Sequence, residues 1–375
     1  MTRRICYLTG TRADFGLMAS TLRWINADPR LSLQLIVTGM HLSQRYGGTV
    51  SEVEAEGFEI AARVAVESDD TSAAGMAMNL GSMLLGFVPA LKEIKPDMLL
   101  LLGDRGEMLA GALAAIHLGI PVVHLHGGER SGTVDEPVRH AISKLSHLHF
   151  VATSEARDRL IRMGERGDSV HVVGAPGVDG LMDATRPARE NLCAQVGFDP
   201  AHSVGLLVFH PVLQESSDAA RQVGDVLQAT EGLQILALMP NSDAGSEAVR
   251  QVLSSAAEQG QIVLKTHLRR DEYIGWLAAC DVLIGNSSSG IIEAASFGTP
   301  VVNIGTRQNL RERNTNVTDV PVETNVIRAA LAKAVSHGRY VPFNVYGDGQ
   351  AGERIVELLA TTVITPELLA KCNAY

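Results

Sequence analysis

Charged and histidine side chains crowd into one segment, PVVHLHGGERSGTVDEPVRHAISKLSHLHF, which covers residues 121–150. Six of the twelve histidines lie between His117 and His149. The polar groups around its Gly-rich turn are His126, Glu129, Arg130, Asp135, Glu136, Arg139 and His140. An acid, a base and an arginine gathered after one strand predict proton transfer, with a positive partner for an anionic leaving group.

The same segment allows a second interpretation as a metal site. In a strand, His124 and His126 share one face, so they are compatible with a pair of metal ligands of the amidohydrolase kind. That class of enzyme needs a barrel with further His and Asp ligands after later strands, which the pattern of this chain does not supply. We therefore expect no metal site, and we expect His147 and His149 to serve packing and hydrogen bonds.

Two further loops offer candidates for the same chemistry. In LLLLGDRGEM, residues 99–108, Asp104 comes directly after a fully apolar run. An acid at the exit of a buried parallel strand points towards the ligand crevice, and partial desolvation raises its pKa for proton transfer. Capping the next helix is the alternative role of Asp104 and does not exclude catalysis. His210 ends another strand, in VFHPV. From the sequence, a role in packing and a role in the site are equally compatible with this position.

The segment TGTRADFG, residues 9–16, is a candidate phosphate loop because it follows a strand and opens a helix. Gly10 permits a tight turn, Asp14 can cap the helix, and Arg12 can reach a phosphate near the helix N-terminal amides. The segment lacks a GxGxxG or P-loop pattern, so a capped turn with a solvated arginine is the alternative.

A stronger diphosphate signal lies in GNSSSGIIEAASFGTPVVNIGTRQNLRER, residues 285–313. Its helix begins with Ser287, Ser288, Ser289 and Gly290. Hydroxyl and backbone N–H groups at a helix N-terminus bind a diphosphate, and the Glu293 carboxylate further along is suited to accept both hydroxyls of a ribose. Local positive charge comes from Arg307, Arg311 and Arg313.

Short apolar runs alternate with helical patterns along the chain, which is typical of parallel sheets covered by helices. A helix is predicted over residues 71–93 from its three- and four-residue apolar spacing. Predicted strands are Arg4–Thr9, Leu33–Thr38, Ile60–Val66, Met98–Leu102, Val122–Leu125, His149–Ala152, His171–Val173, Val204–Phe209, Leu233–Leu238, Ile262–Leu264, Val282–Ile284 and Val301–Ile304. In such folds ligands bind where strands end, which is where the candidate residues lie.

The composition limits the class of protein. With 375 residues, 46% of them apolar and 20% charged, the chain is long enough for two domains with substantial cores. The formal net charge of -10 disfavours nucleic acid and anionic membranes as partners. The four cysteines form no C-x-x-C, and the start of the chain lacks an apolar signal segment, so we expect a cytoplasmic protein without disulfides.

Taken in order, TGTRADFG, LLGDR, HLHGGERSGTVDEPVRHAISKLSHLHF, VFHPV and GNSSSGIIEAASFGTPVVNIGTRQ resemble the hydrolysing UDP-N-acetylglucosamine 2-epimerases of sialic- and legionaminic-acid biosynthesis. The resemblance covers nearly the whole chain. It implies an α/β fold of two Rossmann-like doubly wound lobes, the glycosyltransferase-B type, with the active site in the cleft between them. A dimer or tetramer without metal or redox cofactor is also implied.

The composition shift at residues 174–190 places the domain boundary. We expect a first lobe over residues 1–180 with the catalytic carboxylates and a nucleotide-binding lobe over residues 181–350. C-terminal helices, at 352–361 and 366–372, are expected to cross back to the first lobe.

The resemblance implies a reaction in two halves. Loss of the C2 proton and departure of UDP from C1 give a glycal, and water then adds with inversion at C2 to release N-acetylmannosamine. Catalytic roles carry over to Asp104, Asp135 and His210. Most family members have Glu where this chain has His126, so either His126 or the retained Glu129 takes that role. Nucleotide- and substrate-contact positions carry over to Arg12, Asp14, Arg139, His140, Ser287, Ser288, Ser289, Gly290, Glu293 and Arg307.

Several related activities remain open at the level of the sequence. The same chemistry on GDP-N-acetylglucosamine or on UDP-N,N'-diacetylbacillosamine fits these motifs, and so does a non-hydrolysing UDP-N-acetylglucosamine 2-epimerase. A retaining glycosyltransferase would share the fold and the nucleotide site. A nucleotide-sugar sensor would bind UDP without turnover.

Overall fold

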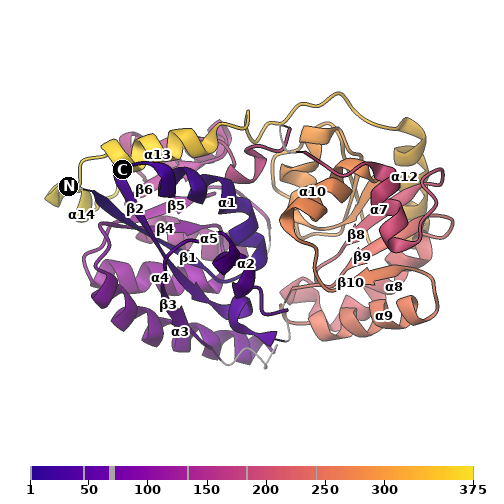
Figure 1. The fold of residues 1–375 in the computed structure, drawn as a ribbon, viewed down its shortest axis with the longest axis horizontal. Helices are drawn as coiled ribbons and strands as arrows, with labels where there is room; N and C mark the ends of the chain where they lie inside the picture. The colour runs from indigo at the N-terminus through magenta and orange to yellow at the C-terminus, as the bar shows by residue number, and fades with distance from the viewer. Residues whose placement is uncertain are drawn as a thin grey trace.

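Two parallel sheets, one from each half of the chain, form the framework of the molecule (Figure 1). The computed structural model describes residues 2–44, 47–66, 72–132, 135–182, 185–241 and 243–374. The first sheet has the order β3-β2-β1-β4-β5-β6-β7. Its strands are β1 (Arg3–Thr9), β2 (Leu31–Thr38), β3 (Ile60–Val64), β4 (Met98–Leu102), β5 (Val122–Leu125), β6 (Leu148–Val151) and β7 (Val170–Val172).

The second sheet repeats this winding with the order β10-β9-β8-β11-β12-β13. Its strands are β8 (Val204–Val208), β9 (Gln234–Leu238), β10 (Val263–Lys265), β11 (Val282–Gly285), β12 (Val301–Ile304) and β13 (Val317–Val320). In both sheets the strand order reverses at one point, between β1 and β4 and between β8 and β11. Ligands of doubly wound sheets bind at such points, beyond the carboxyl ends of the strands.

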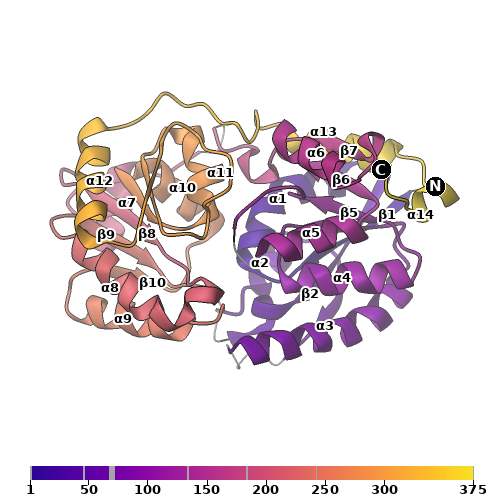
Figure 2. The same ribbon diagram turned by 180° about the vertical axis from the view of Figure 1, so that it is seen from behind.

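Helices cover both faces of each sheet, because successive side chains of a buried parallel strand point to opposite faces. In the first lobe they are α1 (Arg12–Ala27), α2 (Val50–Ala55), α3 (Ala73–Ile94), α4 (Gly106–His117), α5 (Asp135–Leu145) and α6 (Ser154–Arg162). On β1, Ile5 and Tyr7 pack with the α1 side, whereas Cys6 and Leu8 pack with α3 and α4. Figure 2 shows α3, α4 and α5 across this second face.

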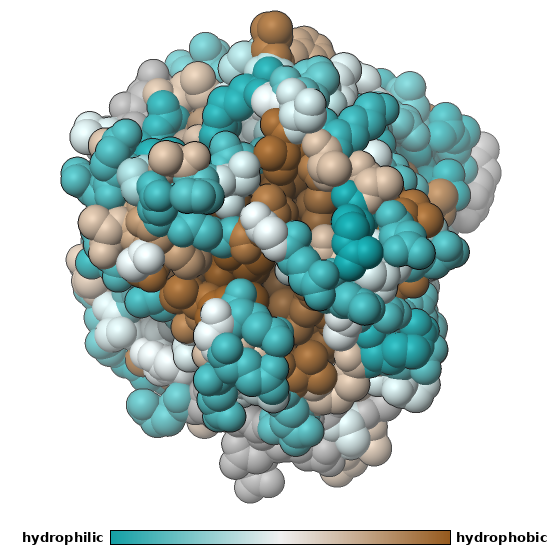
Figure 3. Space-filling view, turned by 90° about the vertical axis from the view of Figure 1, so that its right-hand side faces the viewer, coloured by the Kyte–Doolittle hydropathy of each residue, from teal (hydrophilic) through white to brown (hydrophobic). Residues whose placement is uncertain are grey.

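In the second lobe, α7 (Arg189–Val196), α8 (Ala219–Ala229), α9 (Ser246–Glu258), α10 (Arg270–Ala279), α11 (Ser288–Ile292) and α12 (Thr324–His337) surround the sheet. The free end of this lobe is largely hydrophilic, with hydrophobic residues near its middle (Figure 3). After α12 the chain returns to the first lobe. There α13 (Ala351–Thr361) packs against α1, burying Ile355 and Leu359 in the same core as Ile5, and α14 (Pro366–Leu369) follows.

The predicted strands all occur, with ends shifted by at most two residues. The sequence did not predict β13, whose sequence VTDV is short and polar and whose exposed Thr318 and Asp319 hide the apolar pattern. The predicted helix at 71–93 is α3, although residue 71 lies outside the described residues. Of its apolar residues, Met83 and Phe87 are buried, while Met76 is 36% exposed.

One face of α3 is apolar and exposed. Met78 is 74% exposed and Leu85 is 80% exposed, and their spacing of seven residues, about two turns, places them on one face of the helix. Within the described ranges, α3 is the one helix whose length and composition would suffice to cross a membrane, a test that core helices also pass.

Candidate active site

A cleft of about 1240 Å³ lies between the lobes, where the four central strands end. Residues from all four strand ends line it: the loop that begins with Thr11 after β1, Asp104 after β4, His210 after β8 and Ser287 after β11. The motifs that the sequence placed at strand exits therefore converge on one cavity.

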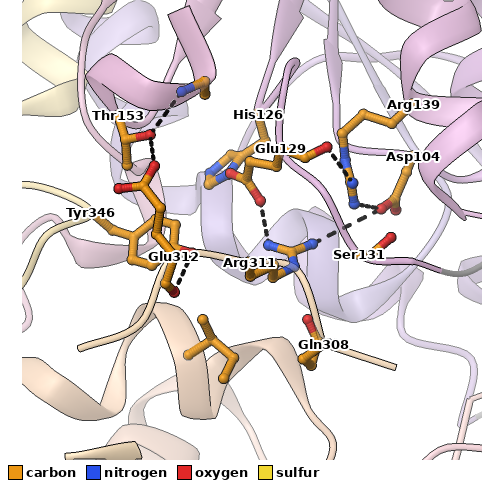
Figure 4. A network of polar contacts seen from close by, with 12 residues as sticks. Asp104, His126, Glu129, Ser131, Arg139, Thr153, Gln308, Arg311, Glu312 and Tyr346 are labelled. Atoms are coloured by element: carbon orange, nitrogen blue, oxygen red, sulfur yellow. Dashed lines mark hydrogen bonds and ion pairs between the residues drawn. The ribbon is translucent and has the colours of Figure 1, made fainter. Parts of the chain in front are cut away.

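Asp104 forms ion pairs instead of capping a helix. The first residue before α4 is Arg105, and it makes no side-chain cap. The Asp104 carboxylate accepts a hydrogen bond from Arg139 Nη2 on α5, and it lies 4.0 Å from Nη2 of Arg311 in the second lobe (Figure 4). Arg139 is almost fully buried and also donates to the Glu129 carbonyl oxygen at 3.0 Å. Two guanidinium groups thus favour the ionised form of Asp104.

His126 and Glu129 form a hydrogen-bonded pair on the turn after β5. His126 adopts a left-handed backbone conformation with a φ of 59°, which is uncommon for a residue other than glycine. This turn brings His126 Nδ1 to 2.5 Å from Glu129 Oε1. Because an ionised carboxylate only accepts hydrogen bonds, Nδ1 carries a proton, and in the neutral form of the ring the lone pair is on Nε2. His126 lines the cleft, whereas Glu129 lies behind it among the buried residues.

The charge of Glu129 is stabilised from the other lobe. Its second oxygen accepts a hydrogen bond from Arg311 Nη1 (Figure 4). Burial by itself raises the pKa of Glu129, but Arg311 and then His126 oppose burial, and the pKa ends below its usual value. Glu129 is therefore an anion that can orient His126 and stabilise its protonated form.

His210, which follows β8 in the second lobe, lies near three arginines of the cleft. Burial, first, and the positive charge of three nearby arginines lower the pKa of His210 well below its usual value, so its ring is neutral. The three are Arg307, Arg12 and Arg105. The backbone N–H of Asn241 donates to Nδ1 at 3.3 Å, which leaves the ring proton on Nε2. A neutral donor beside three cations suits a phosphate oxygen.

The serine loop after β11 is held by hydrogen bonds to its neighbours. Ser287 caps the short helix α11 by accepting from Ser289 N, and Ser289 Oγ also contacts the Tyr273 hydroxyl. The Asn286 carbonyl oxygen accepts a hydrogen bond from Arg307 Nη1 at 3.2 Å. All three predicted serines, Ser287, Ser288 and Ser289, line the cleft.

Glu293, Asp14 and Arg12 are further predicted nucleotide contacts that have protein partners in this structure. Glu293 lines the cleft and is paired with Arg270. Asp14 is the third helical residue of α1 and forms a capping box with Thr11, which is the N-cap residue. Burial comes first among the causes that raise the pKa of Asp14, to about 6. The guanidinium of Arg12 donates to Thr266 O at 2.8 Å and so reaches the second lobe.

Three other predicted residues occupy different positions. Asp135, at the start of α5, lines the cleft. His140 is not among the cleft-lining residues of the described chain; its Nε2 lies 3.8 Å from Glu136 Oε1. Gly290 is also outside the cleft lining in the described part, and a Cβ there would lie 2.9 Å from Val301 Cγ1, so a close approach to β12 explains the glycine.

The two histidines of the H-x-H pair lie in different places: His126 lines the cleft, whereas His124 is buried within the protein framework. In the described ranges no group of three or more His, Cys, Asp and Glu side chains is placed to hold a metal ion. His124 Nε2 donates to Gly103 O at 2.7 Å, and its Nδ1 contacts Ser143 Oγ at 3.0 Å. Burial lowers the pKa of His124 to about 3, so it is a neutral link between the Asp104 loop and α5.

Two further arginines, Arg105 and Arg311, line the cleft. Arg105 was not predicted as a site residue, and Arg311 was predicted only as part of the local positive charge. Arg105 pairs with Glu107 at 3.2 Å and lies 3.6 Å from Asp243 of the second lobe. The basic run that contains Arg307, Arg311 and Arg313 was visible in the sequence, but the partner of each arginine depends on how the lobes meet.

Comparisons with known proteins agree with this geometry. A model of the UDP-N-acetylglucosamine 2-epimerase family matches residues 23–360. The chain is 49% identical over 377 residues, covering 100% of both chains, to the UDP-N,N'-diacetylbacillosamine 2-epimerase (hydrolyzing) of Legionella pneumophila. It is 35% identical over 362 residues, 95% of each chain, to the UDP-N-acetylglucosamine 2-epimerase of Neisseria meningitidis serogroup B.

Solved structures share the fold. The UDP-GlcNAc 2-epimerase from Neisseria meningitidis bound to UDP-GlcNAc has a TM-score of 0.79 at 19% identity, covering 96% of this chain and 100% of that one. The predicted fold class, two Rossmann-like lobes of the glycosyltransferase-B type, is confirmed. On these grounds, the chain belongs to the UDP-N-acetylglucosamine 2-epimerase family.

Proposed function

We propose that this protein is a hydrolysing 2-epimerase of UDP-linked 2-acetamido sugars. The observation that carries the proposal is the pair of His126 and Glu129, which places an imidazole in the same cleft as His210 and its arginines. A base for the C2 proton and a positive site for the leaving diphosphate are the two groups that the first half-reaction needs.

In the first half-reaction, Nε2 of His126 removes the proton from C2. The C1–O bond breaks, its electron pair leaves with UDP, and a double bond forms between C1 and C2. Arg12, Arg105 and Arg307 compensate the charge that develops on the diphosphate, and Nε2–H of His210 donates to one of its oxygens. Ser287 and its neighbours hold the nucleotide, with Glu293 towards the ribose.

In the second half-reaction, water adds to the double bond. Its hydroxyl group goes to C1, and C2 receives a proton on the face opposite the one that lost it. Among the first-lobe carboxylates that line the cleft, we assign this step to Asp104 and Asp135. Asp104, ionised beside its arginines, can take the proton of the water as the hydroxyl adds to C1, and with Asp135 can pass that proton on to C2. The product is the free 2-epimeric sugar, and UDP is released.

UDP-N,N'-diacetylbacillosamine is the first candidate substrate, because the Legionella relative, identical at 49% of positions, carries that activity in its name. The first-lobe side of the cleft supports this choice. Met76, Leu80, Met83 and Val138 line it, and an apolar wall suits the methyl groups of a deoxy sugar with a second acetamido group. UDP-N-acetylglucosamine is the second candidate, by similarity to the Neisseria enzyme.

A substrate panel in deuterated water tests this function. We expect UDP-N,N'-diacetylbacillosamine to give the free 2-epimer with deuterium at C2, together with UDP, faster than UDP-N-acetylglucosamine or either GDP-linked analogue. The measurement is product analysis by mass spectrometry and proton NMR. A product that keeps its nucleotide would identify a non-hydrolysing enzyme, and release of the sugar without deuterium at C2 would contradict the elimination mechanism.

We also propose that the protein is a cytoplasmic homo-oligomer. Four free cysteines, three of them buried, support a reducing compartment. The exposed apolar face of α3, with Met78 and Leu85, supports contact with a second copy. The sialic- or legionaminic-acid pathway that the sequence resemblance implies remains part of this proposal.

Replacing Leu85 with Glu tests the oligomer. A charge in the middle of an apolar interface opposes association, so we expect the variant to shift to a smaller species in light scattering. Val341→Glu is the control, since Val341 is 86% exposed on the connection to α13, away from α3. If Leu85→Glu keeps the mass of the wild type, α3 is not the interface.

A further inference from the structure

Arg311 is a second-lobe side chain that completes a first-lobe pair. It lies on the loop between β12 and β13, its side chain is 9% exposed, and it reaches across the cleft to Glu129 and Asp104 (Figure 4). Glu129 is itself only 5% exposed. Its carboxylate accepts a hydrogen bond from His126 Nδ1–H of the first lobe. Its cationic partner, Arg311, comes from the second lobe. A buried carboxylate that loses such a partner becomes an uncompensated charge.

The loop that carries Arg311 is also tied to the nucleotide end of the cleft. Gln308 and Arg307 both donate to the Asn286 carbonyl oxygen, at 3.1 and 3.2 Å, next to the serine loop. Arg313 donates to the carbonyl oxygens of Gln308 and Arg311, at 2.6 and 2.8 Å. These contacts fix the positions of Arg307 and Arg311, the two arginines of the loop that line the cleft, relative to each other.

The neighbouring residue strengthens the contact between the lobes. Thr153, before α6, donates to the Glu312 carboxylate, and the Tyr346 hydroxyl donates to the Glu312 carbonyl oxygen at 3.0 Å (Figure 4). Arg311 therefore enters the first lobe at a point where the lobes are already held together.

We infer that Arg311 is a positioning residue that couples nucleotide binding to the base. The loop that meets the nucleotide delivers the guanidinium that keeps Glu129 ionised and in contact with His126. The His126–Glu129 pair is complete only when the lobes are closed, so proton removal from C2 is confined to the closed, nucleotide-bound enzyme. This inference rests on the proposed function for the reaction that His126 performs, but the contact with Glu129 is testable without it.

The test replaces Arg311 with Met and with Lys in the full-length protein. For Arg311→Met we expect kcat and C2 deuterium exchange to fall about 100-fold, the scale of a misplaced acid–base group. The Kd for UDP, measured by calorimetry, should rise by far less than kcat falls, because Arg311 acts on the base through Glu129 and affects the nucleotide only by way of the contact between the lobes. Arg311→Lys keeps the charge but not the forked geometry, and should recover part of kcat. Arg328→Met is the control, since Arg328 is 44% exposed on α12.

A double-mutant cycle that combines Arg311→Met with Glu129→Gln shows whether Arg311 acts by positioning Glu129 or independently of it. If Arg311 acts through Glu129, the double variant should be no slower than the slower single variant; losses that multiply would overturn the inference. A UDP affinity that falls in parallel with kcat/KM, with kcat unchanged, would also overturn it, because Arg311 would then be a nucleotide ligand.

A readout without turnover keeps this inference distinct from the proposed reaction. With carboxyl-labelled glutamate and bound UDP, carbon NMR should show that Glu129 titrates at higher pH in Arg311→Met than in the wild type, because burial then acts without its opposing charge. An unchanged titration would overturn the inference even in an active enzyme. A wild type that turns over no sugar would refute the proposed function, and the titration would still decide the role of Arg311.

Discussion

Replacing Asp104 with Asn should lower kcat about 1000-fold, within the range expected for loss of a catalytic acid–base group. Asn keeps the size of the side chain and one acceptor oxygen, so the change removes charge and proton-transfer capacity more than volume. The Asp104 carboxylate is also the direct partner of the buried Arg139 and lies near Arg311. Its loss leaves two guanidinium groups facing the reacting sugar with only Glu129 to balance them.

Steady-state kinetics on the best substrate of the panel, together with UDP calorimetry, would measure this effect. The Kd for UDP should change little, because Asp104 follows β4 in the first lobe, away from the serine loop. Asp97→Asn is a matched control: Asp97 precedes the same strand at its other end, where it accepts the Arg4 N–H at 2.7 Å. Turnover of Asp104→Asn within about tenfold of the wild type would remove Asp104 from the acid–base groups.

The pattern of the sequence was sufficient to predict which loops meet. Both sheets are doubly wound, so residues that directly follow β1, β4, β8 and β11 must gather at the two points where strand order reverses. Asp104 and Ser287 were found in this way, since each directly follows an apolar run. The end of a buried strand can be recognised from the local sequence, because an apolar run stops there.

Contacts between lobes could not be predicted in the same way. Arg311 is 182 residues from Glu129 along the chain, and its partner depends on how two separate sheets face each other. The sequence showed three arginines in one run without indicating that Arg307 lies near His210, that Arg311 enters the first lobe and that Arg313 pairs with Asp319. The way in which the two lobes face each other produces no hydrophobic periodicity in the sequence of either lobe, so it could not be predicted from that pattern.

The sequence did not decide which of His126 and Glu129 faces the cleft, because that depends on the backbone conformation of the turn. Spacing alone puts both on one turn, and either can face the cleft. The left-handed conformation of His126 and the glycine conformation at Gly128, with a φ of 76°, decide it: the imidazole faces the cavity and Glu129 lies behind it. A Cβ on Gly128 would lie 2.4 Å from the carbonyl oxygen of Ala156, so this turn tolerates no other residue there without a shift of α6.

Two substitutions on this turn should therefore have unequal effects. His126→Gln removes the proposed base, and we expect kcat and C2 deuterium exchange to fall about 1000-fold or more. Glu129→Gln keeps the imidazole but removes the anion that orients it and stabilises its protonated form, so a smaller loss, about 100-fold, is expected. The comparison is informative because the two residues are hydrogen-bonded to each other, and only one of them lines the cleft.

C2 deuterium exchange, measured under single-turnover conditions, is the decisive quantity because it reports proton removal apart from product release. His117→Gln is the control, an exposed histidine at the end of α4. The reverse order, with Glu129→Gln slower in exchange than His126→Gln, would make Glu129 the base and His126 its partner. Equal and complete loss in both would contradict the expected difference and would mean that the imidazole removes the proton only while an ionised Glu129 holds its ring.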